Sequence, residues 1–235
     1  MTTAGTLVLD MSGVRKSYSG LRPLRIRSLT VAPLERVAVT GFDAAAAELL
    51  VNLVTGATLP DDGVIRAFGR STADIVDGDD WLASLDRFGI VSDRAVLLEG
   101  STLLQNLTMP FTLEIDPVAP AMVATVTELA AQCGIAAAWL TRPAGALPPE
   151  VRARAHLARA VALGPALLVL EHPTSSVAEP DRAALAADIA RVCDARHLAA
   201  LAITLDEPFA RAFARRVLTL NGATGELAEK KKRWW

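Results

Sequence analysis

The sequence predicts an α/β fold built from one domain of 235 residues. Short apolar runs predict strands, and turn residues or helix-forming stretches separate them. In the first seventy residues the strands follow one another too closely for crossover helices, so mainly antiparallel pairing is expected there. Later strands alternate with helical segments, which is typical of a mostly parallel sheet that helices cover on both faces.

The apolar pattern places each element in chain order. The expected strands are Leu7–Leu9, Ile26–Val31, Val37–Thr40, Gly63–Ala67, Ile90–Val91, Leu167–Leu170, Leu201–Thr204 and Val217–Leu220. The expected helices are Ala44–Val54, Ala121–Cys133, Glu150–Ala162, Arg182–Ala195 and Pro208–Ala214. We therefore expect one domain with two parts and a tail. The parts are a β subdomain plus core from about 1–92 and 161–227, a helical subdomain from about 93–160, and a basic, aromatic tail at 228–235.

Composition excludes several classes of protein. A net charge of −2 argues against a general nucleic-acid binder. No apolar run approaches the roughly 20 residues that span a bilayer, and the start, MTTAGTLVLD, lacks the features of a secretory signal. Cys133 and Cys193 are far apart and lack metal-ligand spacing, so a reducing cytoplasm and no metal site are expected.

The chain ends in a basic run followed by two tryptophans, KKKRWW. Such a run suits an anionic membrane surface, with the indole rings at the level of the lipid headgroups. A solvated, frayed tail is the alternative interpretation. The candidate membrane-surface residues are Lys230, Lys231, Lys232, Arg233, Trp234 and Trp235.

The stretch VAVTGFDAAAAELLVNLVTG, residues 37–56, has the strand–glycine–helix order of a phosphate-binding loop, whose pattern is G-x-x-x-x-G-K-[ST]. Gly41 matches the first glycine, but Ala46, Ala47 and Glu48 stand at the second glycine, the lysine and the hydroxyl residue. The missing lysine removes a charge-assisted phosphate contact worth about 1.5–3 kcal/mol. Glu48 also places negative charge at the helix N-terminus, where an anion would bind.

Two more strands end in polar residues. GPALLVLEHPTSSV, residues 164–177, follows an amphipathic helix, and LAITLDEP comes later. This order resembles the ATP-binding subunit of an ABC transporter from about residue 6 to 227, with residues replaced in every ATPase motif. The resemblance implies an ABC-type ATPase fold. That fold has a P-loop, RecA-like core with an N-terminal antiparallel β subdomain and a helical insert.

The resemblance assigns family roles to individual positions of this chain. Tyr18 stands where the family stacks an aromatic ring on adenine, and ordinary packing is an equal alternative. Asp93 stands at the glutamine of the Q-loop, Ala178 at the D-loop aspartate and Leu205 at the switch histidine. The signature motif falls on Leu147, Pro148, Pro149, Glu150 and Val151.

At the Walker B positions, Glu171 replaces the magnesium aspartate and His172 replaces the catalytic glutamate. A histidine can act as a base near pH 7, although a polar residue at a strand end is the simpler interpretation. Glu171 could still contact Mg²⁺, but position 48 offers no hydroxyl ligand. We expect no catalytic residue, with Glu171 and His172 as weak candidates. No cofactor is expected either, and ATP with Mg²⁺ would bind only if hydrolysis survives.

The family binds ATP between two subunits, with the P-loop of one facing the signature motif of the other. Both motifs are replaced here, so even an intact partner would leave neither composite site complete. The sequence therefore predicts a catalytically inactive ABC-type pseudo-ATPase. It would be peripheral, on the cytoplasmic face of a membrane, and would dock on and stabilise or regulate a membrane permease.

The partners follow from the same resemblance. Asp93 and Arg94 are candidate permease contacts, with a local ion pair between them as the alternative. A second ABC ATPase-like subunit or a second copy of the chain is the other expected partner. Two further functions stay open. One is a divergent transporter ATPase with weak hydrolysis, with or without an intact partner subunit, and the other is a soluble interaction protein on an ABC fold.

Overall fold

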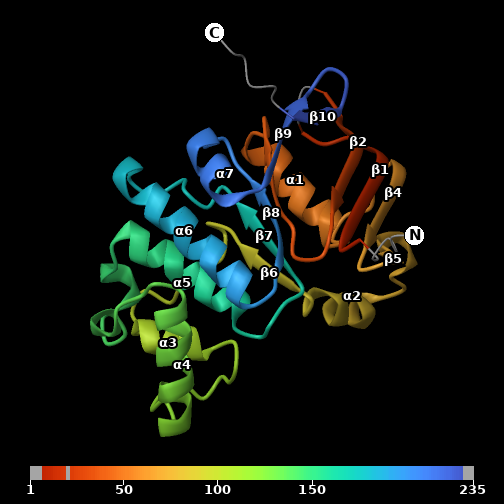
Figure 1. Cartoon of the computed structure of the whole chain (residues 1–235). Coiled ribbons are helices and arrows are strands. Elements are labelled where there is room, and N and C mark those ends of the chain that lie inside the picture. Colours follow the sequence, from red (N-terminus) through yellow and green to blue (C-terminus); the bar gives the residue numbers. More distant parts are fainter. Residues whose placement is uncertain (1–6, 20–21, 230–235) are drawn as a thin grey trace, which may run out of the picture.

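The computed structural model describes residues 7–19 and 22–229 and contains two sheets with helices around them (Figure 1). The predicted membrane-surface residues of the tail lie outside the described residues. The strands are β1 (Leu9–Lys16), β2 (Leu24–Val31), β3 (Arg36–Thr40), β4 (Asp62–Ala67), β5 (Arg70–Ser71), β6 (Phe88–Val91), β7 (Leu167–Glu171), β8 (Ala199–Ile203), β9 (Arg216–Asn221) and β10 (Glu226–Glu229). The helices are α1 (Ala44–Val54), α2 (Gly78–Leu85), α3 (Leu103–Thr108), α4 (Pro120–Gln132), α5 (Pro149–Val161), α6 (Glu179–Ala195) and α7 (Glu207–Phe213).

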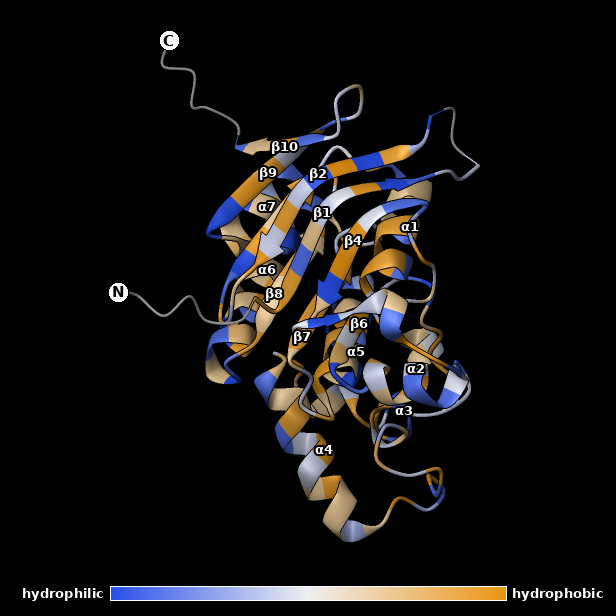
Figure 2. Cartoon of the chain, turned by 90° about the vertical axis from the view of Figure 1, so that its right-hand side faces the viewer, coloured by the Kyte–Doolittle hydropathy of each residue, from blue (hydrophilic) through white to orange (hydrophobic). Residues whose placement is uncertain are grey.

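The first sheet is antiparallel, with the order β2-β1-β4-β5. Its strands alternate buried apolar and exposed polar residues, as the banded hydropathy of β1, β2 and β4 shows (Figure 2). The expected antiparallel pairing is thus confirmed, except that β3 joins the second sheet. The expected strand Leu7–Leu9 was misplaced, because the paired region begins at Leu9 and continues through polar residues to Lys16.

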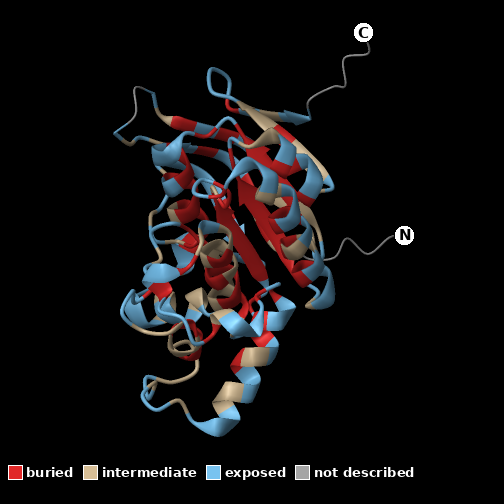
Figure 3. Cartoon of the chain, turned by 90° about the vertical axis from the view of Figure 1, so that its left-hand side faces the viewer, coloured by how far each residue is buried: buried red, intermediate tan, exposed pale blue. Residues whose placement is uncertain are grey.

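The second sheet has the order β10-β9-β3-β8-β7-β6, parallel throughout except for the antiparallel edge strand β10. Its central strands β7 and β8 are buried at every residue, and they form the centre of the molecule (Figure 3). Leu168 and Ala200 pack with the helical side of the core, whereas Val169 and Leu201 pack with α1 and the first sheet. A parallel sheet with both faces covered explains these continuous apolar runs.

Helix α1 has the predicted bounds and packs into the apolar cluster that also contains the inner faces of both sheets. Seven of its eleven residues are buried, because alanine, leucine and valine occupy nearly every position. Its first turn follows β3 directly. The packing therefore fixes the N-terminus of α1 at the carboxyl edge of the parallel sheet.

Most other helices also confirm the sequence prediction. Helices α4, α5, α6 and α7 begin and end within three residues of the expected bounds. The structure adds α2, α3, β5 and β10, which the apolar pattern did not predict. Between β6 and β7 the chain forms α3, α4 and α5, and their apolar residues pack in the helical part of the core.

Two further features concern the part of the chain that the structure describes. None of its helices is both long and apolar enough to cross a membrane. Cys133 and Cys193 are free and buried, and burial raises the pKa of each thiol to about 12. Both cysteines are therefore packing residues with little thiolate character.

Candidate functional site

The carboxyl ends of β3, β6, β7 and β8 meet at one edge of the parallel sheet. The segments that follow these strands contain four residues for which the sequence predicts a role. They are Gly41, Arg94, His172 and Leu205. Ligands of open α/β sheets bind at this edge. The predicted site residues of the core are therefore gathered in one region.

The loop between β3 and α1 is short and is held by the protein itself. Gly41 has a φ of 89°, and Phe42 is completely buried. The Asp43 carboxylate caps α1 by accepting a 2.8 Å hydrogen bond from the backbone N–H of Ala46. The helix already begins at Ala44, the third of the four positions between the glycine positions of the motif. A carboxylate of the chain thus uses a donor at the helix N-terminus that a phosphate would need.

The residues at the other motif positions of α1 supply neither the lysine nor the hydroxyl of the phosphate-binding pattern. Ala46 and Ala47 are buried, and Ala47 has no exposed surface. Glu48 points to the surface and carries a carboxylate where the pattern has a hydroxyl. The N-cap carboxylate of Asp43 and the carboxylate of Glu48, just after the first turn, therefore give this end of α1 negative charge.

Arg94 joins the two carboxylates that stand at ligand positions of the family. Its Nη1 lies 2.5 Å from Oε1 of Glu48, and its Nη2 lies 2.7 Å from Oε2 of Glu171. Ser92 Oγ accepts a 3.3 Å hydrogen bond from Nε of the same guanidinium. Glu48 and Arg94 are about half exposed, but the Glu171 side chain is only 9% exposed. We call Glu48, Arg94 and Glu171 the arginine bridge.

The predicted local ion pair between Asp93 and Arg94 was wrong. Among the described residues Arg94 pairs with α1 and β7, while Asp93 accepts a hydrogen bond from the Ser175 hydroxyl. Both side chains are thus engaged with segments distant in sequence. They fasten the loop after β6 to the rest of the sheet edge.

The two positions associated with hydrolysis lack the geometry of a catalytic pair. His172 has a φ of 43°, and its buried Nε2 has no hydrogen-bond partner among the described residues. Its backbone N–H donates to Ile203 O at 2.8 Å. Leu205 is 63% exposed and apolar, so its side chain cannot bond a phosphate. A general base must present a free nitrogen to the water it activates, and Nε2 of His172 is buried.

Tyr18 is half-buried and packs against the apolar cluster around α1. Burial raises the pKa of its phenol, and the negative charge of Asp43 raises that pKa further. Tyr18 therefore lies on the same side of the sheet as the loop before α1. This confirms the packing interpretation, while stacking on adenine stays a prediction.

The signature segment begins α5 and makes its contacts locally. Pro148 caps the helix without a side-chain hydrogen bond, and Pro149 is its first residue, as expected for a proline in a first turn. Leu147 and Val151 are buried, so they belong to the core. In residues 7–19 and 22–229, no hydrogen bond or ion pair joins this segment to the arginine bridge. Ala178, at the D-loop position, caps α6 without a side-chain bond.

Sequence reasoning missed the roles of Arg94 and Asp43. The sequence shows only that Glu48 and Glu171 are acidic and that Arg94 is the cation after β6, which does not by itself pair them. The described residues contain no group of three or more His, Cys, Asp or Glu side chains that could hold a metal ion. The cation that contacts the Glu48 and Glu171 carboxylates is the guanidinium of Arg94.

Proteins similar in sequence to this chain include some that are named as import ATP-binding proteins. No family model matches the chain. It is 29% identical over 225 residues to the "Fe(3+) ions import ATP-binding protein FbpC 2" of Rhodococcus jostii, which covers 95% of the chain and 62% of that relative. It is 28% identical over 227 residues to the "Methionine import ATP-binding protein MetN" of Brucella abortus, covering 97% of the chain and 60% of the relative. The chain thus spans about three fifths of the length of these relatives.

Solved structures agree with these relatives. A dimeric post-hydrolysis state of the ATP-binding cassette MJ0796, bound to ADP and Pi, superposes with a TM-score of 0.77 at 20% identity over 97% of this chain and 100% of that one. The chain has the fold of an ABC transporter ATP-binding domain. CbiO1 of Clostridium perfringens has a TM-score of 0.78 at 16% identity, over 95% of this chain and 87% of that one. The ABC-type fold predicted from the sequence is confirmed.

Proposed function

We propose that the chain is a non-hydrolysing ABC-type subunit that docks on a membrane permease and stabilises or regulates it. The observation that carries this proposal is the arginine bridge, because it occupies both carboxylates at the sheet edge with a cation of the chain. The sequence relatives are named as import ATP-binding proteins, which supports a role beside a transporter.

The bridge disfavours MgATP by charge and by geometry. Two carboxylates and one guanidinium leave a net charge of −1 at the place where a phosphate chain and Mg²⁺ would meet. Binding Mg²⁺ to Glu171 would break its 2.7 Å contact with Arg94. The Asp43 carboxylate would have to leave the N–H of Ala46 before a phosphate could accept from it. Each of these two changes loses one charge-assisted hydrogen bond, which is worth about 1.5–3 kcal/mol.

Docking is supported by a cavity of about 460 Å³ between the β6 region and α5. Its lining is mainly apolar, with Phe88, Ile90 and Met109 among its residues, and it includes the charged residues Asp86 and Arg159. Leu163 lines the same cavity and is 62% exposed. We assign this surface to an amphipathic segment of the permease.

The loop after β6 borders this cavity. Ala95 lines it, and Val96, which is 74% exposed, accepts a 2.6 Å hydrogen bond from Nη1 of Arg159 at its carbonyl oxygen. Asp93 and Arg94, the predicted docking residues, are exposed and also bind other segments of the chain, so their contact with a permease stays a prediction. We infer that they hold this loop in the shape that a permease meets.

A weakly hydrolysing ATPase is the second candidate. It is favoured by Tyr18, which remains beside the loop before α1, and by Glu171, which remains at the end of β7. The same subunit would then need an intact ABC ATPase or a second copy as its partner. It would also need Arg94 to leave Glu171 during turnover.

The docking proposal is tested by purifying the intact chain from gently solubilised native membranes and counting the subunits by mass. We expect a stable complex with a permease. The Leu163→Glu variant should lose that permease, whereas Leu34→Glu, an equally exposed leucine outside the cavity, should retain it. Recovery of an intact ATPase in the complex would favour the second candidate. A lone soluble monomer would contradict a transporter role.

His156 lines the docking cavity and makes stability depend on pH. It is buried, and its Nδ1 has no hydrogen-bond partner within the part of the chain that the structure describes. Burial lowers its pKa from the usual 6.5, and the charge of Arg159 lowers that pKa further. The unfolded chain then binds the proton more readily, so the contribution of neutral His156 is full above pH 6.5 and is lost as the pH falls below that value. Denaturant titrations should show this loss, and His156→Gln should reduce it. An unchanged profile in the variant would contradict the assignment.

A further inference from the structure

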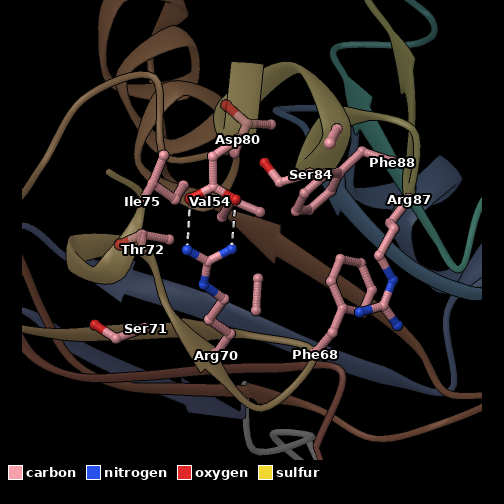
Figure 4. Close-up of a pocket in the computed structure, with 13 residues that line it drawn as sticks. Val54, Phe68, Arg70, Ser71, Thr72, Ile75, Asp80, Ser84, Arg87 and Phe88 are labelled. Atoms are coloured by element: carbon pink, nitrogen blue, oxygen red, sulfur yellow. Dashed lines mark hydrogen bonds and ion pairs between the residues drawn. The ribbon is translucent and has the colours of Figure 1, made fainter. Parts of the chain in front are cut away.

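A second cavity, of about 220 Å³, lies away from the sheet edge where the arginine bridge sits (Figure 4). Its walls come from the C-terminal end of α1, the turn between β4 and β5, helix α2 and the start of β6. No function considered so far uses this cavity. It combines apolar walls with a few polar groups, which is the usual composition of a small-molecule site.

Two aromatic rings form one wall of the cavity. The rings of Phe68 and Phe88 lie 5.0 Å apart between centroids at an angle of 57°. The guanidinium carbon of Arg87 lies 3.8 Å from the centroid of the Phe68 ring, and Figure 4 shows the two side chains lying side by side. Val54 and Ile75 add aliphatic surface. The cavity therefore offers aromatic and aliphatic surface against which the planar apolar ring of a ligand can pack.

The charges in the cavity do not cancel. Arg70 and Asp80 form a bidentate pair with distances of 2.7 and 2.5 Å, and this hydrogen bonding lowers the pKa of Asp80 to about 2. The pair is therefore ionised and neutral overall. Arg87 has no carboxylate partner among the described residues. One positive charge is left at the mouth of the cavity.

Most hydroxyl groups of the lining already donate within the chain. Ser84 Oγ donates to Trp81 O at 2.7 Å, and Thr72 Oγ1 donates to Ile65 O at 3.5 Å. Ser71 Oγ only accepts, from the backbone N–H of Ala73 at 3.3 Å, so its own proton remains available. The free polar groups are thus donors, namely the Arg87 guanidinium and the Ser71 hydroxyl.

Size restricts the ligand further. A dry cavity of about 150 Å³ holds benzene, so this one holds a single six-membered ring with a small substituent. We propose that the cavity binds a small aromatic carboxylate. Its ring packs against Phe68 and Phe88, and its carboxylate accepts hydrogen bonds from Arg87. This proposal does not depend on the proposed function.

Benzoate is the probe, titrated into ¹⁵N-labelled protein while backbone amide shifts are followed. We expect saturable shifts of residues in α2 and the β4–β5 turn, with a dissociation constant of about 1–10 mM for so small a ligand. Benzamide, which has the same shape without the charge, should bind about tenfold more weakly or worse, since charged hydrogen bonds are the stronger ones.

Three variants locate the site. Arg87→Gln should weaken benzoate binding about tenfold. Ala83→Phe, which fills the cavity from α2, should abolish binding without touching the guanidinium. Arg215→Gln, an exposed arginine outside the cavity, should bind as the wild type does. The proposal is overturned if benzoate gives no saturable shift at about 20 mM. It is equally overturned if benzamide binds as well, or if Ala83→Phe leaves the affinity unchanged.

Discussion

Replacing Phe42 with alanine is expected to lower the free energy of unfolding by about 3–5 kcal/mol. Phe42 is among the largest completely buried side chains, yet it lies in the short loop between β3 and α1. It packs with both sheets and α1 in one apolar cluster. The buried ring of Phe42 thus anchors the loop in the apolar core, so the loop needs no bound phosphate to keep its conformation.

Urea titration of the purified chain measures this effect. Phe42→Leu keeps most of the buried volume and should cost less than about 1.5 kcal/mol. If the loop is anchored as described, Phe42→Ala should also speed proteolysis near residues 41–48. A loss below about 1 kcal/mol for Phe42→Ala would mean that the cluster collapses around the vacancy. In that case the ring is not the anchor.

The second large effect is expected at Arg94. Its replacement by alanine leaves the Glu171 carboxylate without a counterion. That side chain is only 9% exposed, so it is 91% buried. We expect a loss of about 2–3 kcal/mol, below the figure for a fully buried pair because Arg94 itself is half-exposed. The outer contact to Glu48 should add at most about 1 kcal/mol.

A double-mutant cycle isolates the inner contact. Glu171→Gln should be destabilising in the wild type but stabilising in the Arg94→Ala background, where it removes an unpaired buried charge, giving a coupling energy of about 1 kcal/mol or more. Arg94→Lys should recover only part of the loss, because an ammonium cannot reproduce the forked contact to two carboxylates. Additive effects of the two substitutions would show that the arginine bridge contributes nothing measurable in solution.

Local signals explain which elements were predictable. Helix α1 was predicted to the residue, because Gly41 ends the strand and an uninterrupted run of helix formers follows the Asp43 cap. Strand β1 was misplaced because its exposed face carries polar residues, so a search for apolar runs ended at Leu9. Helix α3 was missed although Thr102 and Gln105 form a capping box that the sequence displays.

The site was predictable in its position but not in its contacts. The resemblance correctly placed Glu48 and Glu171 at the same sheet edge, since both positions follow from the order of strands. Arg94 lies 46 residues from the first and 77 from the second, and no local pattern predicts a contact over such separations. The hydrogen bond between Asp93 and Ser175, 82 residues apart, could not be predicted for the same reason.

We propose above all that the chain does not bind and hydrolyse MgATP. The most direct measurement is phosphate release by the purified chain at saturating MgATP, together with calorimetric titration of the nucleotide. We predict no release above buffer and no saturable binding below about 1 mM, which corresponds to about −4 kcal/mol. Micromolar binding, with turnover that Glu171→Gln or His172→Ala removes, would contradict the account and establish the chain as an active ATPase.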